Sequence, residues 1–435
     1  MHLQLSTLTL SLSTIFFLSA CGDGVERNST PTKLRPSLAE MSGHFIDSGV
    51  EGITYSRSNG GEHITQEGGK YNYYLSERLT FRVGNLEIGT ALGLSTITPK
   101  DIVSYEDLTL STSIEDPEVN NRTRTLMSLD EDQNPANGIQ ISPQTRASAL
   151  SWETPDYSLS ETAFTDALKR VTNNDIATVV SREDAIDHLS TSLRCVYSGA
   201  YSGTWLYPNG SKDGFVGVMI QANGTIVTLG DGQDLNNDGN FSEFLFARGS
   251  HNADTGYFYF DETGEFKDGG IIPSDIEVSG DGSSQSYDRV TGSFKQINPE
   301  TGLIEEGSYE ANRVGQGDDV SYRYTGYGYD NPTSNENPLT DKILGLFTLD
   351  INRNGSIYGL IHDARNNQEP SLLGQIDFTT GIVDMNLSYE DGSNYKITGT
   401  ILFDGTLNLD WFDETGTQKY GYIDGVGCQL QVPTL

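Results

Sequence analysis

Short turn dipeptides recur through the second half of the chain, and their spacing constrains the fold more than any other feature. Between residues 195 and 435, Asn or Asp followed by Gly alternates with Thr followed by Gly. Such dipeptides are typical of tight connections between antiparallel strands. The runs between them, such as NYKITGTILF and GTLNLDWF, are rich in strand-favouring residues. We therefore expect an antiparallel meander that forms a barrel or a sandwich. The dipeptides include Asn209-Gly210, Asp213-Gly214, Asn223-Gly224, Asp268-Gly269, Asn354-Gly355, Asp391-Gly392 and Asp404-Gly405 for the first type, and Thr255-Gly256, Thr263-Gly264, Thr291-Gly292, Thr301-Gly302, Thr380-Gly381 and Thr415-Gly416 for the second.

The same half of the chain contains an internal repeat. Segment 214–230, GFVGVMIQANGTIVTLG, resembles segment 342–360, KILGLFTLDINRNGSIYGL. A repeat at this spacing indicates two similar units in tandem. We expect barrel-like units over residues 195–318 and 319–435, because segments of this length suit small up-and-down barrels.

Strand patterns also dominate residues 43–145, whereas residues 146–194 have helical spacing. In the first segment, runs such as KYNYYLSERLTFRVG are bounded by glycines. In the second, Phe164, Leu168 and Val171 recur at the spacing of one helix face. The predicted fold is therefore mainly β: a small β-sandwich, a short helical connector, and duplicated antiparallel barrel or sandwich units.

The N-terminus carries an apolar stretch, LSTLTLSLSTIFFLSAC, that ends at Cys21. It resembles the bacterial lipobox, in which the chain is cut before a cysteine whose thiol carries lipid. The resemblance implies a signal peptide over residues 1–20, palmitate-type lipidation of Cys21 and a polar tether over residues 21–42. Gly22 and Asp23 follow the cysteine, which implies an outer-membrane lipoprotein facing the periplasm or the cell surface. The alternative is an uncleaved membrane anchor, although the run is short for a bilayer span.

A second resemblance concerns the strand-rich segment that follows the tether. The order FIDSGVEGITY, GGKYNY, LTFRVGNLEIG, ITPKDIV and LDEDQNPANGIQI resembles a module of surface lipoproteins and adhesin-like proteins of Gram-negative bacteria. That module implies a β-sandwich akin to carboxypeptidase-regulatory-like or immunoglobulin-like folds. Further along, YSGTW and GTLNLDWFD resemble motifs in barrel domains of envelope lipoproteins, including those of the transferrin-binding type.

Charge and cysteine content narrow the possible partners and the compartment. The formal net charge is −34, from 61 acidic and 27 basic residues, so the surface repels phosphate backbones and we expect no nucleic-acid binding. With Cys21 lipidated, Cys195 and Cys428 remain. In an oxidising envelope compartment these two would form a disulfide that joins the first and last strands of the C-terminal half. The alternative is two free thiols.

One loop has the oxygen-rich pattern of a calcium site. The stretch DLNNDGNFSE (residues 234–243) offers carboxylate and amide oxygens around a glycine, but position 12 of the loop is Leu245 and not glutamate. The sequence therefore predicts a hairpin loop that either binds structural calcium weakly or forms a polar turn. A second cluster, LDEDQNPANG (residues 129–138), has the same two readings, and Pro135 and Gly138 favour the turn. The candidate ligands in the first loop are Asp234, Asn236, Asp238, Asn240, Ser242 and Glu243.

A run of aromatic residues, YRYTGYGYD, lies between the two repeats. Tyr322 and Tyr324 are expected on one face of a strand, and Tyr327 and Tyr329 are also expected to share a face. If these residues are exposed, they could stack on sugar rings or on a partner protein. The alternative is a half-buried strand whose hydroxyl groups contact water.

The sequence contains none of the short motifs by which catalytic sites are usually recognised, such as paired metal-binding histidines or a nucleophile elbow. His188 on the helical stretch suggests either a site residue or a solvated helix histidine. We therefore predict a lipid-anchored envelope protein that binds or adheres to a protein or glycan partner and has no catalytic activity. The alternatives are a barrel that binds a small apolar ligand, which requires a large apolar cavity, and a glycan-acting enzyme, which requires two converging carboxylates.

Overall fold

The structure is a computed structural model. The described residues are 39–106, 112–210, 212–231, 244–267, 270–272, 277–297, 302, 304–317, 319–329, 343–363, 368–431 and 433. The signal peptide and the lipidated Cys21 predicted from the sequence lie outside them, as do the tether up to residue 38 and the loop 234–243. Among the described residues, no helix is long and apolar enough to cross a membrane.

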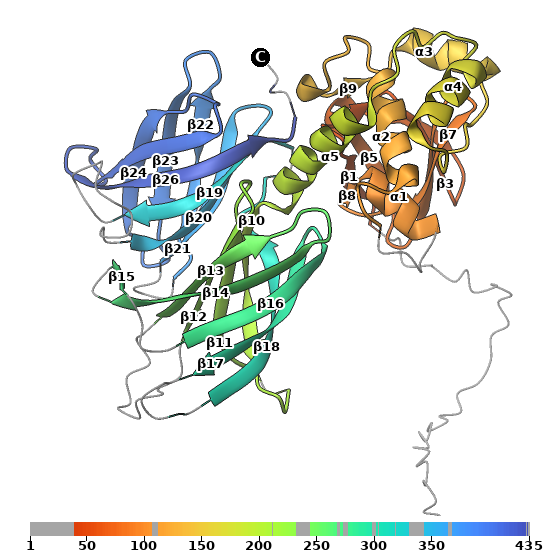
Figure 1. Cartoon of the computed structure of the whole chain (residues 1–435). Coiled ribbons are helices and arrows are strands. Elements are labelled where there is room, and N and C mark those ends of the chain that lie inside the picture. The colour runs from red at the N-terminus through yellow and green to blue at the C-terminus, as the bar shows by residue number, and fades with distance from the viewer. Residues whose placement is uncertain are drawn as a thin grey trace, which may run out of the picture. The chain divides into compact units, whose positions relative to one another are not determined.

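Strands of residues 199–314 close into a first barrel, which we call barrel 1 (Figure 1). Neighbouring strands pair antiparallel, β18 pairs with β10, and β13 pairs with β14, so that the ring has no open edge. Strand β15 adds to β14 outside this ring. The strands are β10 (Gly199–Leu206), β11 (Lys212–Ile220), β12 (Thr225–Asp231), β13 (Phe244–His251), β14 (Tyr257–Lys267), β15 (Gly270–Ile272), β16 (Glu277–Ser286), β17 (Arg289–Ile297) and β18 (Ile304–Val314).

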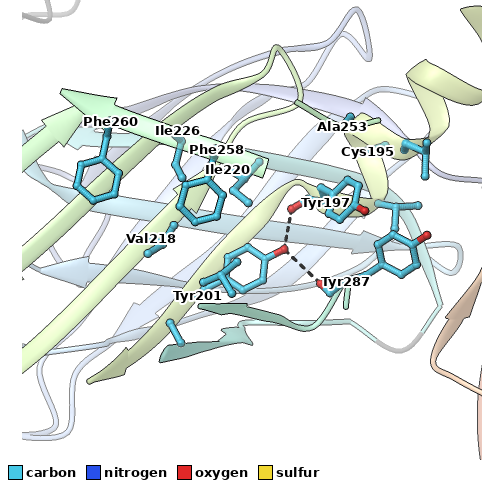
Figure 2. Close-up of a cluster of buried hydrophobic side chains, with 14 of the residues drawn as sticks. Cys195, Tyr197, Tyr201, Val218, Ile220, Ile226, Ala253, Phe258, Phe260 and Tyr287 are labelled. Atoms are coloured by element: carbon cyan, nitrogen blue, oxygen red, sulfur yellow. Dashed lines mark hydrogen bonds between the residues drawn. The ribbon is translucent and has the colours of Figure 1, made fainter. Parts of the chain in front are cut away.

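Side chains fill the interior of barrel 1, as Figure 2 shows for part of the cluster. Val218, Phe258 and Val290 are fully or almost fully buried there. Tyr201 lies at one end of this core, and its hydroxyl group donates to the backbone oxygens of Tyr197 at 2.8 Å and Tyr287 at 3.2 Å. The buried phenol therefore keeps hydrogen-bond partners inside an otherwise apolar core.

A second closed barrel, barrel 2, is formed by strands of residues 320–429. The alternation of exposed and buried residues along β23 and β25 is that of strands with one face towards a core. Phe347, Leu387 and Leu409 are fully buried in that core. The strands are β19 (Val320–Tyr329), β20 (Ile343–Asn352), β21 (Ser356–Asp363), β22 (Ser371–Asp377), β23 (Ile382–Ser388), β24 (Asn394–Thr400), β25 (Thr406–Phe412) and β26 (Lys419–Gln429). The mainly β, antiparallel fold class is thus confirmed.

The turn dipeptides are partly confirmed. Asn223-Gly224 joins the second and third strands of barrel 1, and Asn354-Gly355 joins the second and third strands of barrel 2, where the internal repeat places them. Thr263-Gly264 and Thr291-Gly292 instead lie within β14 and β17, so the turn prediction was wrong there. A Cβ at Gly292 would approach the ring of Tyr309 to 2.5 Å, so this glycine makes room for a core tyrosine.

The N-terminal part, residues 40–197, combines small sheets with helices around a hydrophobic core, and some of its helix residues, such as Val119 and Leu193, belong to the core cluster of barrel 1. Its sheets have the orders β5-β1-β8, β4-β3-β6-β7 and β2-β9, and the pairs β1–β8 and β2–β9 are parallel. The strands are β1 (Met41–Phe45), β2 (Val50–Glu51), β3 (Thr54–Arg57), β4 (Glu62–Ile64), β5 (Lys70–Tyr73), β6 (Arg78–Val83), β7 (Leu86–Leu92), β8 (Thr96–Ile97) and β9 (Ile139–Gln140).

Helices supply the remaining elements of this N-terminal part. Phe164 and Leu168 on α4 are fully buried in the same core as the sheets, as the helical spacing predicts. Helix α5 begins after Ser181, whose side chain accepts a hydrogen bond from the backbone of Asp184 at 3.1 Å. The α-helices are α1 (Pro99–Glu106), α2 (Pro117–Ser128), α3 (Pro143–Ser148), α4 (Glu161–Val171) and α5 (Arg182–Tyr197), and the 3₁₀ helices are η1 (Glu67–Gly69), η2 (Pro135–Asn137) and η3 (Ala149–Ser151).

Candidate functional site

A polar pocket of about 240 Å³ lies where the N-terminal strands, both barrels and the C-terminal residues approach one another. Two arginines line it: Arg313 at the end of β18, and Arg323 on β19. Both belong to a chain in which acidic residues outnumber basic ones by 61 to 27. Buried, paired arginines are uncommon in such a setting, so we describe this pocket as the candidate site.

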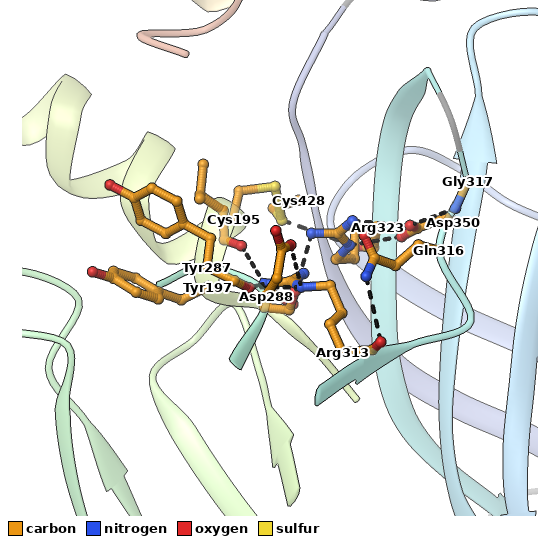
Figure 3. Close-up of polar contacts among 12 residues, drawn as sticks. Cys195, Tyr197, Tyr287, Asp288, Arg313, Gln316, Gly317, Arg323, Asp350 and Cys428 are labelled. Carbon is orange, nitrogen blue, oxygen red and sulfur yellow. Dashed lines mark hydrogen bonds and ion pairs between the residues drawn. A yellow bond between two sulfur atoms is a disulfide. The ribbon is translucent and has the colours of Figure 1, made fainter. Parts of the chain in front are cut away.

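Arg313 is held by the C-terminal end of helix α5 (Figure 3). Its Nη2 donates to the backbone oxygen of Val196 at 2.6 Å, its Nη1 donates to the backbone oxygen of Ser198, and its Nε donates to that of Tyr287 at 2.8 Å. The carbonyl end of a helix carries partial negative charge and accepts a cation. Burial lowers the pKa of Arg313, and the backbone oxygens compensate its charge in place of a carboxylate.

Arg323 also lines the pocket, and it pairs with a buried carboxylate. Its Nε and Nη2 donate to the two oxygens of Asp350 at 2.7 and 2.9 Å, the paired geometry that suits a guanidinium. Its Nη1 donates to the backbone oxygen of Ser198 at 3.2 Å, so both arginines meet at one carbonyl. Burial lowers the pKa of Arg323, but the charge and hydrogen bonds of Asp350 outweigh burial and raise it.

Asp288, in the turn between β16 and β17, supplies the carboxylate that lines the pocket. One of its oxygens lies 4.0 Å from Nε of Arg313, and the other accepts a hydrogen bond from the side chain of Ser95. Its side chain is 48% exposed, whereas Asp350 is 1% exposed. The buried part of the site thus contains two guanidinium groups and one carboxylate, and Asp288 adds a negative charge at its solvent side.

The predicted disulfide between Cys195 and Cys428 is confirmed, and it borders this pocket (Figure 3). It does not join two strands as we expected, because Cys195 lies in helix α5. Cys428 lies on β26, directly opposite Arg323 on β19. The bond therefore fixes the helix end that receives both arginines to the strand beside Arg323.

The tyrosines of β19 do not form an exposed aromatic patch. Each predicted pair does share a face, but the two faces are opposite and both are covered. Tyr324 is 1% exposed in the core of barrel 2, with Tyr322 half-buried against that core. Tyr329 is 1% exposed and packs with Tyr327 in a cluster that includes Phe246 of barrel 1. Of the two alternatives, the exposed stacking surface is not the one found, because barrel 1 covers one face of the strand and the core of barrel 2 covers the other.

The second acidic cluster, residues 129–138, forms a turn whose acidic side chains accept hydrogen bonds from neighbouring residues. Asp130 accepts from the backbone of Asn134 and of Gln140, both at 2.8 Å, and Asp132 accepts from the side chain of Asn137 at 2.7 Å. Burial raises the pKa of Asp130 to about 6. Within the described ranges, no group of three or more His, Cys, Asp or Glu side chains could hold a metal ion. The predicted calcium ligands Asp234 to Glu243 fall outside these ranges.

His188 is not a solvated helix residue, contrary to that expectation. Its side chain is 12% exposed, and Nε2 lies 3.3 Å from a carboxylate oxygen of Asp47, which is fully buried. Burial lowers the pKa of His188, but the negative charge of Asp47 outweighs it and raises the pKa. The pair ties helix α5 to the loop between β1 and β2.

Sequence reasoning missed both pocket arginines and Asp288. Arg323 was visible as the basic residue inside the aromatic run, and a charge flanked by strand tyrosines is a signal for a buried ion pair. Arg313 gave no such signal, because two of its partners are the backbone oxygens of Val196 and Ser198, more than a hundred residues away in the sequence.

Comparisons with known proteins assign this chain to no family. No protein-family model matches the sequence, and no curated protein matches it. Among solved structures, the chain is similar to a double mutant of the vaccine antigen transferrin binding protein B from Haemophilus parasuis. The identity is 9%, the match covers 53% of this chain and 75% of that chain, and the TM-score is 0.17. This similarity is too weak to assign a family or a function. The evidence for the two barrels is therefore the strand pairing of this chain itself.

Proposed function

We propose that the chain is a lipoprotein, anchored through Cys21 in the outer membrane of a bacterial envelope, that binds a protein or glycan on its outer surface without catalysis. The lipid anchor follows from the lipobox resemblance. The binding function is supported by the structure of the barrels, whose interiors hold side chains and whose outer faces carry exposed aromatic residues.

The filled interiors carry this proposal. Barrel 2 has a continuous core, with Phe347, Leu372 and Ile397 fully buried. In the described part of barrel 1, the apolar pocket beside Trp205 and Phe260 has a volume of about 40 Å³. Pockets for small molecules usually measure about 300–1,000 Å³. An apolar ligand inside a barrel therefore receives no support, and the outer surface is the better candidate.

Two exposed tyrosines on β14 offer such a surface. Tyr257 and Tyr259 are 47% and 48% exposed, and their spacing of two places them on the same face of the strand. On the neighbouring strand, Ser283 pairs with Tyr257 and Asp281 pairs with Tyr259. Aromatic faces beside hydroxyl and carboxylate groups suit the apolar face and hydroxyls of a sugar, and also a protein contact.

The buried carboxylate that pairs with Arg323 favours binding over hydrolysis. Both oxygens of Asp350 accept hydrogen bonds from Arg323, and Oδ2 also accepts from the backbone of Gly317 at 3.0 Å. Glycoside hydrolysis needs one carboxyl group that donates a proton and one free carboxylate. Asp350 suits neither task, because both of its oxygens already accept hydrogen bonds from a guanidinium.

The test compares partner binding by the mature chain and by a Tyr257→Ser/Tyr259→Ser variant on glycan and extracellular-protein arrays. We expect binding that falls at least tenfold in the double variant, because exposed aromatic anchors contribute about 1–2 kcal/mol each to recognition. The matched control is Tyr358→Ser, which removes a 41% exposed tyrosine from β21 of barrel 2. Equal loss in the control, or turnover of an arrayed glycan, would overturn the proposal.

A further inference from the structure

We infer that the pocket at Arg313 and Arg323 binds the carboxylate group of a small, singly charged organic acid. The inference rests on the proposed binding function and names one ligand class for the chain. It is carried by the two buried guanidinium groups, by their unused donors and by the size and lining of the pocket.

Both arginines keep hydrogen-bond donors beyond those that their protein partners use. A guanidinium has five N–H donors, and three of those of Arg323 take part in the hydrogen bonds to Asp350 and Ser198 given above. Arg313 uses Nε, Nη2 and one N–H of Nη1 for hydrogen bonds to Tyr287, Val196, Tyr201 and Ser198, which leaves its second Nη1 N–H. Since both side chains line the pocket, their remaining N–H groups can serve the two oxygens of a carboxylate.

The charge of the site favours a monoanion. Arg313 and Arg323 are 8% and 7% exposed, and Asp350 is the carboxylate buried with them. Their sum is one positive charge, which is costly in a buried setting and is only partly offset by the helix end. A single carboxylate would neutralise it, whereas a phosphate dianion would leave one excess negative charge.

The remaining walls describe the rest of the ligand. Val320 and Leu430 give an apolar side, and Ser42 and Gln316 give hydroxyl and amide groups. A volume of about 240 Å³ lies just below the usual range for drug-sized ligands. The pocket therefore suits an acid of few atoms with a short aliphatic or hydroxylated body. A free hydroxy acid and an acidic monosaccharide both meet this description.

Asp288 competes with such a ligand. Its carboxylate lies 4.0 Å from Arg313 at the solvent side of the pocket, where it already satisfies part of the positive charge. Removing this charge should tighten binding, and placing a new carboxylate at Gln316 should weaken it. Asp288 is half-exposed and Gln316 is exposed. Their side-chain contacts are those of Asp288 with Arg313 and Ser95, and a hydrogen bond of 3.4 Å from Nε2 of Gln316 to the backbone oxygen of Arg313.

The experiment titrates the mature chain with sodium lactate and with sodium glucuronate, and follows ligand binding by calorimetry at constant ionic strength. We expect saturable binding of at least one acid, and a response to inorganic phosphate no greater than that to sodium chloride. Asp288→Asn should lower the Kd about two- to fivefold, and Gln316→Glu should raise it by a similar factor, as expected for a charge near the surface. Binding of lactate identifies the ligand class as a free hydroxy acid. Binding of glucuronate without binding of lactate identifies it as an acidic monosaccharide.

The matched control is Asp384→Asn, which removes a carboxylate of 69% side-chain exposure from barrel 2. An equal change in Kd in this control, no saturable binding of either acid, or stronger binding of phosphate would each overturn the inference. Tyr257 and Tyr259 do not line the pocket. A negative carboxylate titration with intact array binding therefore refutes the pocket ligand alone, and the reverse result refutes the proposed surface.

Discussion

Removing the disulfide should destabilise the chain strongly. The sulfur atoms of Cys195 and Cys428 form a bond that joins positions 233 residues apart in the sequence. A cross-link over a loop of this length lowers the entropy of the unfolded chain by an amount equivalent to about 5 kcal/mol at 25 °C. A Cys195→Ser/Cys428→Ser variant should lose free energy of unfolding of about that size, less any structure that remains in the unfolded state.

Urea denaturation of the oxidised mature chain and of the double serine variant measures this loss, with thiol titration under native conditions as the companion assay. We expect no titratable thiol in the mature chain and a lower urea midpoint in the variant. A variant with an unchanged midpoint would refute the reasoning, because the bond would then constrain nothing in the unfolded state. Two titratable thiols in the native chain would refute the bond itself.

Three further predictions concern the buried charges and the calcium loop. Asp350→Asn should lower the free energy of unfolding by about 3–5 kcal/mol, because the substitution leaves Arg323 buried without its carboxylate. Thermal melting measures this loss, and an unchanged melting midpoint would contradict the prediction. His188→Gln should lower the free energy of unfolding most below the ordinary histidine pKa of about 6.5, and this loss of stability should fade as the pH rises through the raised pKa of His188. Urea midpoints at pH 5.5 and 8.5 test this, and a larger loss of stability at pH 8.5 refutes it. Millimolar calcium should raise the melting midpoint of the mature chain but not of an Asp234→Ala/Asp238→Ala variant, and equal shifts in both would mean that this loop is a polar turn.

The barrel architecture was predictable because its signals are local. Glycines at the turns adopt positive φ, as at Gly224 with φ of 86° and Gly355 with φ of 83°, and strand alternation needs only neighbouring residues. The same local logic failed at Gly292, where the glycine is required by a ring on the next strand. A dipeptide alone does not distinguish a turn from a close contact across a sheet.

The candidate site was not predictable, because long-range contacts form it. Arg313 meets the end of a helix that precedes it by more than a hundred residues, and His188 meets Asp47 across a similar distance in sequence. Burial of the β19 tyrosines was equally hidden. Alternation shows which residues share a face, but it does not show that barrel 1 covers the outer face of that strand at Tyr329.

Native mass spectrometry of the full chain, purified in mild detergent from Gram-negative membranes, tests the central claim most directly. The account predicts a chain that begins at Cys21 with the added mass of a lipid anchor, and barrels that carry no apolar small molecule. A chain that retains residues 1–20 would contradict the lipid anchor at Cys21. A stoichiometric apolar ligand that copurifies with the chain and is removed by organic extraction would contradict barrels filled by their own side chains.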